Sequence, residues 1–393
     1  MKILVVNSGS SSLKLRLVEL DRARYAVLAD GAVERIGPGA ILVFSQAGLA
    51  PVRREVSIVD WHAALQQLLR VLGDAGCSSI VAVGHRVVNG GRFSQPVVID
   101  DAVVEAIEGA RRLAPLHNGP ALEGIRAARH LLPGTPMVAV FDTAFHAAMP
   151  HVATQYALPD ELTTGFGLKR YGYHGIAHRS MTERYGEIAG VRPDDIAIIT
   201  LQLGNGCSAA AVRGLGSIDT SMGFTPAEGL VMGTRSGDLD PAAVTYLQRE
   251  HRMSPDEIDA MLNHKSGLIG LSGTTGDMGA LLEQERRGDP RARAAIELFC
   301  YRARKYIGAY LAVLGKTQAV VFGGGIGERA PEIRRRICEP LAPLGLIVDN
   351  ARNAAVVGCE GRFDEAGSPI AAWVIPSDEQ RIIAQDTYEI LAR

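Results

Sequence analysis

A few cationic side chains stand where they could bind anions. Arg86 and Arg235 lie inside glycine-flanked loops, and His174 lies between Tyr173 and Gly175. A guanidinium holds an oxyanion through two parallel hydrogen bonds, and an imidazole can donate a further one. This set is therefore suited to a phosphate or a carboxylate. Each residue also fits a structural role, as an ion-pair partner for either arginine or as a hydrogen-bonded loop residue for the histidine.

Two carboxylates follow predicted strands. Asp142 comes directly after residues 137–141, and Glu379 comes shortly after residues 371–375. Carboxylate oxygens are ligands that Mg²⁺ prefers. A carboxylate in such a place can also do no more than cap a turn, so both interpretations stay open.

Two polar turns could bind phosphate. Residues 7–12 and 204–208 each gather backbone N–H groups and hydroxyls on a concave surface, which favours anionic oxygens. Lys14 follows the first turn on the same strand face as Ser12 and could reach a phosphate as a point charge. The alternatives are an ordinary hairpin turn, which uses the same residue types, and a solvated strand lysine.

The two turns belong to similar segments. Residues 2–17 and 196–212 both run from an apolar strand through a glycine-containing turn into a second strand. A hairpin of one kind that opens each half of the chain predicts a duplicated domain pair. Two unrelated hairpins are the alternative.

Three better-known motifs fail on inspection. Residues 314–317 contain the G-K-T of a P-loop, but the glycine required five residues before Gly315 is Tyr310, so we expect a helix end there. Residues 323–328 do not satisfy G-x-G-x-x-G. Residues 272–276 resemble a phosphate loop of adenylate-forming enzymes but lack the Pro-Lys expected after it. The glycines at 323–325 still allow a flat ring to approach the backbone, or they form a tight turn before a helix at Pro331.

Length, charge and composition restrict the class of protein and the kinds of partner further. The 393 residues suffice for two or three domains, and 41 Lys+Arg against 43 Asp+Glu leave a net charge of −2. We therefore expect no nucleic-acid partner and no membrane partner. With 47% hydrophobic residues and no apolar run long enough for a membrane span or signal peptide, we expect a soluble cytoplasmic protein. The five cysteines form no C-x-x-C pair and are predicted to be buried thiols.

Apolar β-branched runs alternate with helical patterns, which predicts an α/β fold. The predicted strands are 3–6, 80–83, 137–141, 196–201, 319–322 and 371–375. The predicted helices are 60–72 with Asp60 as its cap, 100–113, 120–131, 241–250, 291–314 and 380–391.

Taken together, the motifs resemble those of the acetate kinase family. They run in order over almost the whole chain: N-S-G-S-S-S-L-K at 7–14, G-H-R-V-V-N-G-G at 84–91, A-P-L-H-N at 114–118, F-D-T-A-F-H at 141–146, R-Y-G-Y-H-G at 170–175, L-G-N-G at 203–206, M-G-T-R-S-G-D-L-D-P at 232–241 and G-G-G-I-G-E at 323–328. The resemblance implies two duplicated ribonuclease H-like (actin-like ATPase) domains with a nucleotide cleft between them. It implies an N-terminal domain of residues 1–145 closed by a C-terminal helix at 383–393, and a nucleotide-binding domain of residues 146–382.

The resemblance also implies roles for residues. Arg86 binds the acyl substrate, Arg235 and His174 stabilise the transferring phosphoryl group, and Asp142 is a further catalytic residue. Mg²⁺, with Mn²⁺ as a substitute, is placed by Asn7, Asp142 and Glu379. The pocket for the substrate's methyl group matches Val88, Leu116, Tyr173 and Pro226. The ATP and phosphate path matches Ser10, Ser12, Lys14, His117, Gln202, Leu203, Gly204, Asn205, Gly206, Asp277, Met278, Gly279, Gly323, Gly324, Gly325, Ile326 and Gly327.

Five positions depart from the family's pattern. Gln202 stands in place of a histidine, Tyr173 in place of phenylalanine, and Asp378 in place of asparagine. Gly279 replaces an arginine that would lie over the purine, and Arg329 replaces an asparagine. Arg329 could stack on the base in place of the lost arginine. The alternative is relaxed base selection, with another nucleoside triphosphate or pyrophosphate as donor.

The resemblance implies reversible, direct in-line transfer of a phosphoryl group from ATP to acetate, giving acetyl phosphate and ADP, by a homodimer. A short carboxylic acid is already ionised at neutral pH, so this transfer needs no strong base. Propionate or another short-chain acid is the alternative substrate, because one methylene changes binding by only about 1–3 kcal/mol. A non-catalytic nucleotide-driven clamp of the actin or chaperone kind is the alternative from another class.

Overall fold

The computed structural model describes residues 1–22, 24–46, 48–77, 79–111 and 114–392. The chain forms two compact units, one of residues 1–145 with 378–393 and the other of residues 146–377. The domain boundary that the sequence suggested between residues 382 and 383 falls inside the last helix, α15 (Glu379–Leu391). That helix packs as a whole on the sheet of the first unit.

The first unit is built on one mixed sheet, whose strand order is β5-β4-β3-β2-β1-β6-β8-β7. Its strands are β1 (Lys2–Ser8), β2 (Ser12–Leu20), β3 (Tyr25–Glu34), β4 (Gly37–Gln46), β5 (Val52–Ile58), β6 (Ala82–Val87), β7 (Val97–Val98) and β8 (Met137–Phe141). Strands β1, β6 and β8 run parallel, and β2 returns antiparallel beside β1. The carboxyl ends of three neighbouring strands therefore meet at one edge of the sheet.

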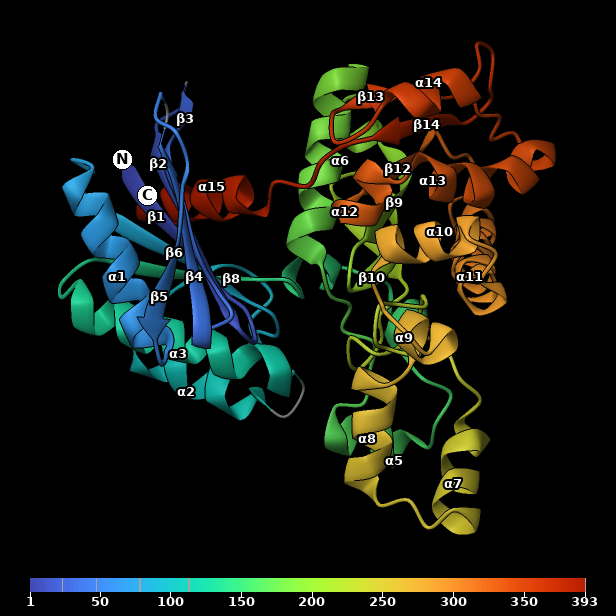
Figure 1. The fold of residues 1–393 in the computed structure, drawn as a ribbon, viewed down its shortest axis with the longest axis horizontal. Coiled ribbons are helices and arrows are strands. Elements are labelled where there is room, and N and C mark those ends of the chain that lie inside the picture. Colours follow the sequence, from blue (N-terminus) through green and yellow to red (C-terminus); the bar gives the residue numbers. More distant parts are fainter. Residues whose placement is uncertain (23, 47, 78, 112–113, 393) are drawn as a thin grey trace. The chain divides into compact units, whose positions relative to one another are not determined.

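Helices cover both faces of this sheet (Figure 1). They are α1 (Trp61–Asp74), α2 (Asp101–Gly109), α3 (Pro115–Leu131) and α15. Alternate residues of β1, Leu4 and Val6, point into the core formed with α1, α2 and α3. Their neighbours Ile3, Val5 and Asn7 point to the opposite face, which α15 contacts.

The second unit repeats the same core. Its sheet has the order β11-β10-β9-β12-β14-β13, with β9 (Ala197–Leu203), β10 (Cys207–Arg213), β11 (Gly216–Thr220), β12 (Ala319–Gly323), β13 (Gly361–Arg362) and β14 (Ala371–Val374). In both units two antiparallel pairs are followed by two parallel pairs, in β3-β2-β1-β6-β8 and in β11-β10-β9-β12-β14. The predicted duplication and the ribonuclease H-like α/β fold class are confirmed.

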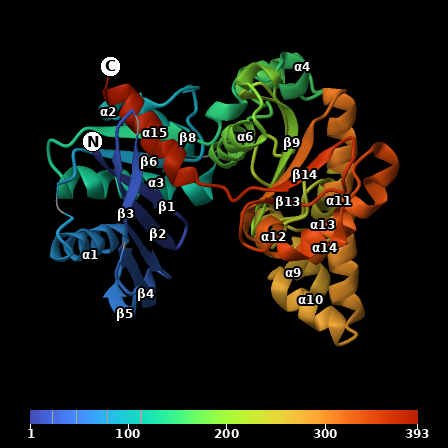
Figure 2. The same cartoon turned by 90° about the horizontal axis from the view of Figure 1, so that it is seen from above.

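Most helices of the chain belong to the second unit. They are α4 (His151–Thr154), α5 (Asp160–Phe166), α6 (Gly175–Ala189), α7 (Pro241–Glu250), α8 (Pro255–His264), α9 (Gly267–Ser272), α10 (Met278–Arg286), α11 (Pro290–Leu314), α12 (Gly324–Arg329), α13 (Pro331–Cys338) and α14 (Asn350–Ala355). Helix α6 packs against β9, and α11 packs against β9 and β10. Figure 2 shows the strands of this sheet between α6 and α11.

Local signals placed several helix ends correctly. Asp60 caps α1 by accepting a hydrogen bond from the backbone N–H of Ala63, as predicted. Helix α11 ends at Leu314, so the G-K-T sequence is a helix end and not a phosphate loop. Four cysteines are buried as predicted, but Cys359 is exposed.

Other boundaries were wrong. The helix predicted from Pro120 begins at Pro115, where a missing N–H costs nothing in the first turn. The strand predicted over residues 80–83 is β6, which continues to Val87 because it pairs with β1 on one side and β8 on the other. The glycines from Gly324 onward form helix α12, not a tight turn before α13. Among the described residues, no helix is long and apolar enough to cross a membrane.

Candidate active site

Polar side chains of the first unit gather where its parallel strands end. Arg86 near the end of β6 donates to both carboxylate oxygens of Asp142, from Nη2 at 2.7 Å and from Nε at 3.2 Å. Its Nε also lies 3.4 Å from Oε2 of Glu379, at the start of α15, and its Nη1 lies 3.5 Å from Oδ1 of Asn7 in β1. The structure thus brings together four residues that the sequence placed far apart. Arg86 was expected in a loop, but it lies in a strand.

Burial makes this cluster electrostatically strong. The Asp142 side chain is 1% exposed, and that of Arg86 is 18% exposed. Burial on its own lowers the pKa of Arg86, but the carboxylates of Asp142 and Glu379 outweigh it and raise the pKa above its usual value. The guanidinium therefore stays charged, and two anionic groups share it.

A glycine sets the packing behind Arg86. A Cβ on Gly84 would overlap Oγ1 of Thr387 and lie 2.7 Å from Cγ2 of Ile383, both on α15. The absence of a side chain at this position lets α15 lie close to β6 and bring Glu379 to the cluster.

The first turn lies beside the cluster. Strands β1 and β2 pair with Asn7 opposite Lys14, so the two side chains share a face of the sheet. Between the strands, Gly9 donates its N–H to the carbonyl of Ser12 at 2.8 Å, and Trp61 Nε1 donates to the carbonyl of Gly9 at 3.2 Å. Ser10 and Lys14 are exposed. The predicted hairpin is confirmed, and its polar groups are accessible.

The remaining predicted residues of the first unit lie near strand or helix ends. Val88 directly follows β6 and is 8% exposed. His117 lies in the first turn of α3, where its N–H donates to the carbonyl of Ala114. The side chain of Leu116 lies outside the described part of the structure.

In the second unit, three predicted residues surround one point. A Cβ built on Gly206, in the β9–β10 turn, would lie 3.4 Å from His174 Nε2 and 3.5 Å from Arg235 Nη1. Asn205 belongs to the same turn, and its carbonyl accepts a hydrogen bond from the N–H of Gly233 at 2.9 Å. A small space beside Gly206 is therefore faced by an imidazole and a guanidinium.

In the part of the chain that the structure describes, no carboxylate neutralises the charge of Arg235. Its Nη1 donates to the carbonyl of Pro226 at 3.1 Å and lies 3.6 Å from the sulfur of Met232. Burial lowers the pKa of Arg235 below its usual value. None of the carboxylates in the described ranges forms an ion pair with it, in contrast to Arg86. A partly buried guanidinium of this kind is suited to a bound anion.

His174 takes an unusual backbone conformation. Its φ is +58°, in the left-handed region, at the N-terminus of α6. Its Nδ1 lies 2.8 Å from Ser208 Oγ, which lies 2.8 Å from Nε2 of His178. Nδ1 of His178 in turn lies 2.7 Å from Oγ1 of Thr200. The strand residues Ser208 and Thr200 thus fix the imidazole through a chain of hydrogen bonds.

A side-chain clamp holds the loop that carries Pro226 and Arg235. Tyr156 donates to Glu228, and Arg170 donates to the same carboxylate at 2.6 Å. The N–H of Phe224 donates to the hydroxyl of Tyr156 at 2.8 Å. Residues 221–240 contain no helix or strand, so these contacts replace regular structure. Sequence reasoning assigned no role to Tyr156, Arg170 or Glu228. Arg170 opens the R-Y-G-Y-H-G motif, but the three residues are far apart in the chain, and no spacing connects them.

The side chain of Tyr173 holds the same loop in place. Its side chain is 1% exposed, and its hydroxyl donates to the carbonyl of Phe224 at 2.7 Å. The added hydroxyl therefore supports the same loop. Val88 belongs to the first unit whereas Tyr173 and Pro226 belong to the second, so the acyl pocket expected from the resemblance stays a prediction.

A buried arginine, Arg334, supports the glycine motif that begins at the end of β12. Gly324 has a φ of +75°, and a Cβ there would lie 2.5 Å from the carbonyl oxygen of Leu203. Arg334 is 0% exposed and donates to the carbonyls of Gly327 at 2.7 Å and Glu328 at 3.1 Å. Burial lowers its pKa to about 10. Arg334 stands in an R-R-R run that has the appearance of an exposed basic patch, so no sequence signal marked it.

Only part of the glycine motif is open. A Cβ on Gly323 would lie 2.5 Å from the sulfur of Met181, whereas one on Gly325 would meet nothing within 4 Å. Gly323 and Gly324 thus serve packing, and Gly325 is the position that leaves room for a ligand. Ile326 lies in α12 between Gly325 and Gly327.

Comparisons with known proteins agree along the whole chain. The model of the acetokinase family matches residues 2–385. A protein of Solibacter usitatus named acetate kinase is 47% identical over 405 residues, which cover 98% of this chain and 97% of that protein. The chain belongs to the acetokinase family.

Solved structures of the acetokinase family share its fold. A crystal structure of acetate kinase from Porphyromonas gingivalis has a TM-score of 0.91 at 39% identity and covers 99% of both chains. A propionate kinase from Francisella tularensis subsp. tularensis SCHU S4 has a TM-score of 0.92 at 39% identity, also over 99% of both chains.

The departures from the acetokinase pattern have definite places. Asp378 caps α15 and accepts from Nη1 of Arg16 at 2.9 Å, so its added charge is paired. Gln202 carries an Oε1 that is buried without a hydrogen-bond partner in the described part of the chain. Gly279 and Arg329 are both exposed.

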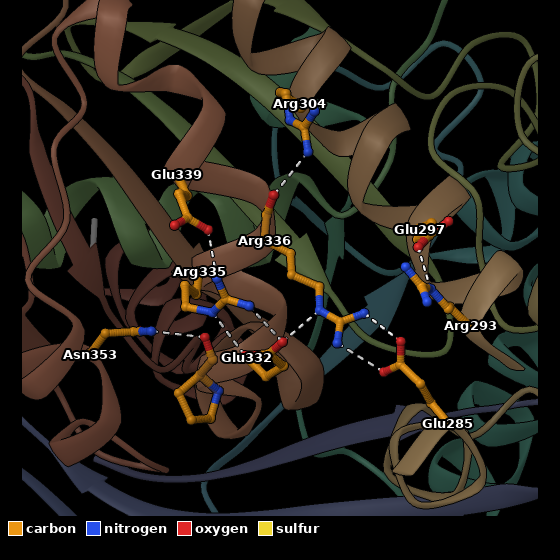
Figure 3. A network of polar contacts seen from close by, with 10 residues as sticks. Glu285, Arg293, Glu297, Arg304, Glu332, Arg335, Arg336, Glu339 and Asn353 are labelled. Carbon is orange, nitrogen blue, oxygen red and sulfur yellow. Dashed lines mark hydrogen bonds and ion pairs between the residues drawn. The ribbon is translucent and has the colours of Figure 1, made fainter. Parts of the chain in front are cut away.

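Beside these positions, Asp277 caps α10 by accepting from the N–H of Ala280 at 2.8 Å, and Met278 is buried. An ion pair fixes this helix to α13, and a hydrogen bond from Arg304 on α11 to the carbonyl of Arg336 joins α13 to α11 (Figure 3). Arg336 on α13 donates to both oxygens of Glu285 on α10 at 2.9 Å, and its Nε donates to Glu332 at 2.6 Å. The carboxylates shown in Figure 3 are all paired with arginines, so the network explains how α10 is positioned.

The acidic residues of the first unit suit magnesium. Asn7, Asp142 and Glu379 offer one amide and two carboxylate groups, which are hard oxygen donors. No group of three or more His, Cys, Asp or Glu that could hold a metal occurs in the described residues. Mg²⁺ often binds through one or two carboxylates, with substrate phosphates and waters completing its shell, so the set fits this ion.

Proposed function

We propose that this chain is an acetate kinase, which transfers the γ-phosphoryl group of ATP to acetate in a direct in-line reaction and gives acetyl phosphate and ADP. The observation that carries the proposal is Arg235, a partly buried guanidinium that faces His174 beside Gly206 and has no carboxylate partner among the described residues. Such a group is expected where negative charge develops during phosphoryl transfer. The reaction is reversible because an acyl phosphate can return its phosphoryl group to ADP.

Arg86 is proposed to bind the anionic acyl substrate. Arg86 is paired with Asp142 and Glu379. Because a guanidinium has five N–H donors, Arg86 can also donate hydrogen bonds to the carboxylate of the substrate. Acetate is ionised at neutral pH, so Asp142 need not act as a strong base. Its proposed task is to orient Arg86 and to place the metal together with Asn7 and Glu379.

Bound with ATP, Mg²⁺ would supply positive charge to the phosphate oxygens, and Mn²⁺ could replace it. In the second unit, Arg235 and Nε2 of His174 are proposed to donate to the equatorial oxygens of the transferring group. Ser10, Ser12 and Lys14 of one turn, with His117, and Gly204, Asn205 and Gly206 of the other are proposed to line the phosphate path.

The nucleotide is proposed to lie against the glycine motif and the start of α10. The residues concerned are Gln202, Leu203, Asp277, Met278, Gly279, Gly323, Gly324, Gly325, Ile326 and Gly327. Support comes from the open space at Gly325 and from Arg334 and Arg336, which fix α12 and α10. Because Gly279 replaces an arginine of the family's pattern, another nucleoside triphosphate or pyrophosphate is the alternative phosphoryl donor.

Propionate is a second candidate substrate. The Francisella protein with a TM-score of 0.92 is named a propionate kinase, and it is as similar to this chain as the Porphyromonas acetate kinase. The proposed pocket of Val88, Leu116, Tyr173 and Pro226 would discriminate by one methylene only, which is worth about 1–3 kcal/mol.

Trapping the acyl phosphate with hydroxylamine tests the proposal. The purified protein is assayed with acetate, propionate and butyrate, each with ATP, GTP or pyrophosphate. We expect the highest kcat/KM with acetate and ATP, and loss of most turnover in Arg86→Ala and Arg235→Ala. Near-normal turnover in either variant would refute the proposed roles. We further propose a cytoplasmic homodimer, as the resemblance implies, and light scattering tests the dimer.

A further inference from the structure

The hydrogen bonds that link His174 to Ser208, His178 and Thr200 all run in one direction, from donor to acceptor. Thr200, His178 and Ser208 are all 0% exposed, so bulk water is not available to satisfy their polar atoms. The chain runs from Thr200 Oγ1 to His178 Nδ1, from His178 Nε2 to Ser208 Oγ, and from Ser208 Oγ to His174 Nδ1, with distances of 2.7, 2.8 and 2.8 Å. Each link holds one hydrogen, and the two hydroxyls have one hydrogen each.

His178 is neutral in this chain. Burial, together with the neighbouring His146 and His174, lowers its pKa well below its usual value. A neutral imidazole carries a hydrogen on one ring nitrogen and a lone pair on the other. Only two arrangements then satisfy every link, and they run in opposite directions.

In the first arrangement, Thr200 donates to His178, His178 donates from Nε2 to Ser208, and Ser208 donates to His174 Nδ1. Every polar atom of the chain is then satisfied. His174 accepts at Nδ1, so its own hydrogen lies on Nε2, the atom next to Gly206 and Arg235.

In the second arrangement, His174 donates from Nδ1 to Ser208, Ser208 donates to His178, and His178 donates to Thr200. The hydroxyl hydrogen of Thr200 is then left without an acceptor, since His178 Nδ1 is the only hydrogen-bond partner of Thr200 Oγ1 in the described structure. A buried donor without an acceptor is unfavourable. With a neutral His174, the same arrangement leaves a lone pair on Nε2, which would repel a phosphate oxygen.

We infer that Thr200, His178 and Ser208 are positioning residues that hold His174 as the neutral tautomer with its hydrogen on Nε2, so that a hydrogen-bond donor is already directed at the phosphoryl site beside Gly206. This inference deepens the proposed role of His174 and rests on the proposed function. The donor needs no proton from solvent, and its orientation is fixed before substrate binds.

The tautomer can be observed directly in the full-length protein. Histidine labelled with ¹⁵N distinguishes a protonated ring nitrogen from an unprotonated one by long-range ¹H–¹⁵N correlation, and His174→Asn and His178→Asn variants assign the two signals. We expect His174 with its hydrogen on Nε2 and a lone pair on Nδ1 at pH 7.5 without ligands. A hydrogen on Nδ1, or on both nitrogens, overturns the inference.

Variants at the far end of the chain test its direction. Thr200→Val keeps the shape but removes the hydroxyl, so we expect a mixture of both His174 tautomers and a kcat lowered about 10-fold, with both KM values within about 2-fold. Thr200→Ser restores the hydroxyl and should restore tautomer and kcat. Thr220→Val is the matched control, because its buried hydroxyl donates instead to the carbonyl of Ala209.

The outcomes separate this inference from the proposed function. If the His174 signals of Thr200→Val are the same as those of the wild type, the inference is overturned even if the protein is an active kinase. The expected tautomer together with no acyl phosphate formation overturns the proposed function and leaves the directional chain established.

Discussion

Arg86 and Asp142 form a pair whose structural and catalytic contributions can be separated. Asp142 is 1% exposed, and it accepts two hydrogen bonds from Arg86 at 2.7 and 3.2 Å. In Arg86→Ala the buried carboxylate loses this partner, and breaking a buried pair costs about 3–5 kcal/mol. Because Arg86 is 18% exposed and water can partly replace it, we expect the lower end, about 3 kcal/mol of unfolding free energy.

The double variant supplies the decisive comparison. In Arg86→Ala/Asp142→Asn the buried charge is gone, so we expect about 2 kcal/mol of the loss to be recovered. Turnover should not recover, because the guanidinium proposed to bind substrate is still missing. We expect a loss of at least about 100-fold in kcat for both variants.

Tryptophan fluorescence can report the first unit by itself. The chain has two tryptophans, Trp61 in the first unit and Trp373 in the second. In a Trp373→Phe background, urea unfolding followed at Trp61 gives the midpoint for the unit that contains the pair. Equal midpoints for wild type and Arg86→Ala, or a double variant as unstable as Arg86→Ala, would refute the electrostatic argument.

Three further predictions concern other positions. Arg334→Met removes the donors to the carbonyls of α12, so we expect the KM for ATP to rise about 10-fold with little change in the KM for acetate. The control Arg335→Met should change neither KM, because Arg335 is half-buried and donates to Glu332 and Glu339 instead of to α12. Equal effects from both variants would argue against a positioning role of Arg334. Burial lowers the pKa of His85 to about 3, against about 6.5 in the unfolded chain. Between these two pH values the unfolded state binds more protons than the folded state. The unfolding free energy therefore falls by about 1.4 kcal/mol for each pH unit below 6.5. His85→Leu should flatten this acid limb, and an unchanged slope in urea titrations would contradict the assignment. Gly84→Ala places a Cβ against α15 and should lower the unfolding free energy by about 2 kcal/mol, whereas Gly109→Ala, which meets nothing within 4 Å, should not lower it; thermal melts of the two variants compare them.

The sequence predicted the parts of the fold that local pattern determines. Alternating apolar residues around a polar turn identified both hairpins, and these hairpins revealed the duplication. The end of β6 was missed because the residues after Val83 include His85 and Arg86, which are untypical of a buried strand. Their backbone is nevertheless paired on both sides, by β1 and β8. Tertiary pairing overrides local composition at such a position.

The candidate site was predicted unevenly for a related reason. Motifs identified residues that are proposed to face a ligand, such as Asn7, Arg86 and Arg235. Motifs could not identify the residues that hold this set in place. A buried supporting residue needs only one suitable contact, and that contact requires no fixed spacing in the sequence. Arg334 and Glu228 act through backbone carbonyls and a tyrosine, and such contacts leave no pattern in the sequence.

Formation of an acyl phosphate with the phosphoryl group of ATP is the property that defines the proposed function. The most direct measurement follows ADP and trapped acyl phosphate together, with purified protein, Mg²⁺, ATP and acetate. We expect one acyl phosphate for each ADP, and no ADP when acetate is omitted. ADP release without acyl phosphate, whether or not acetate is present, would contradict the proposed function and would indicate a nucleotide-driven clamp.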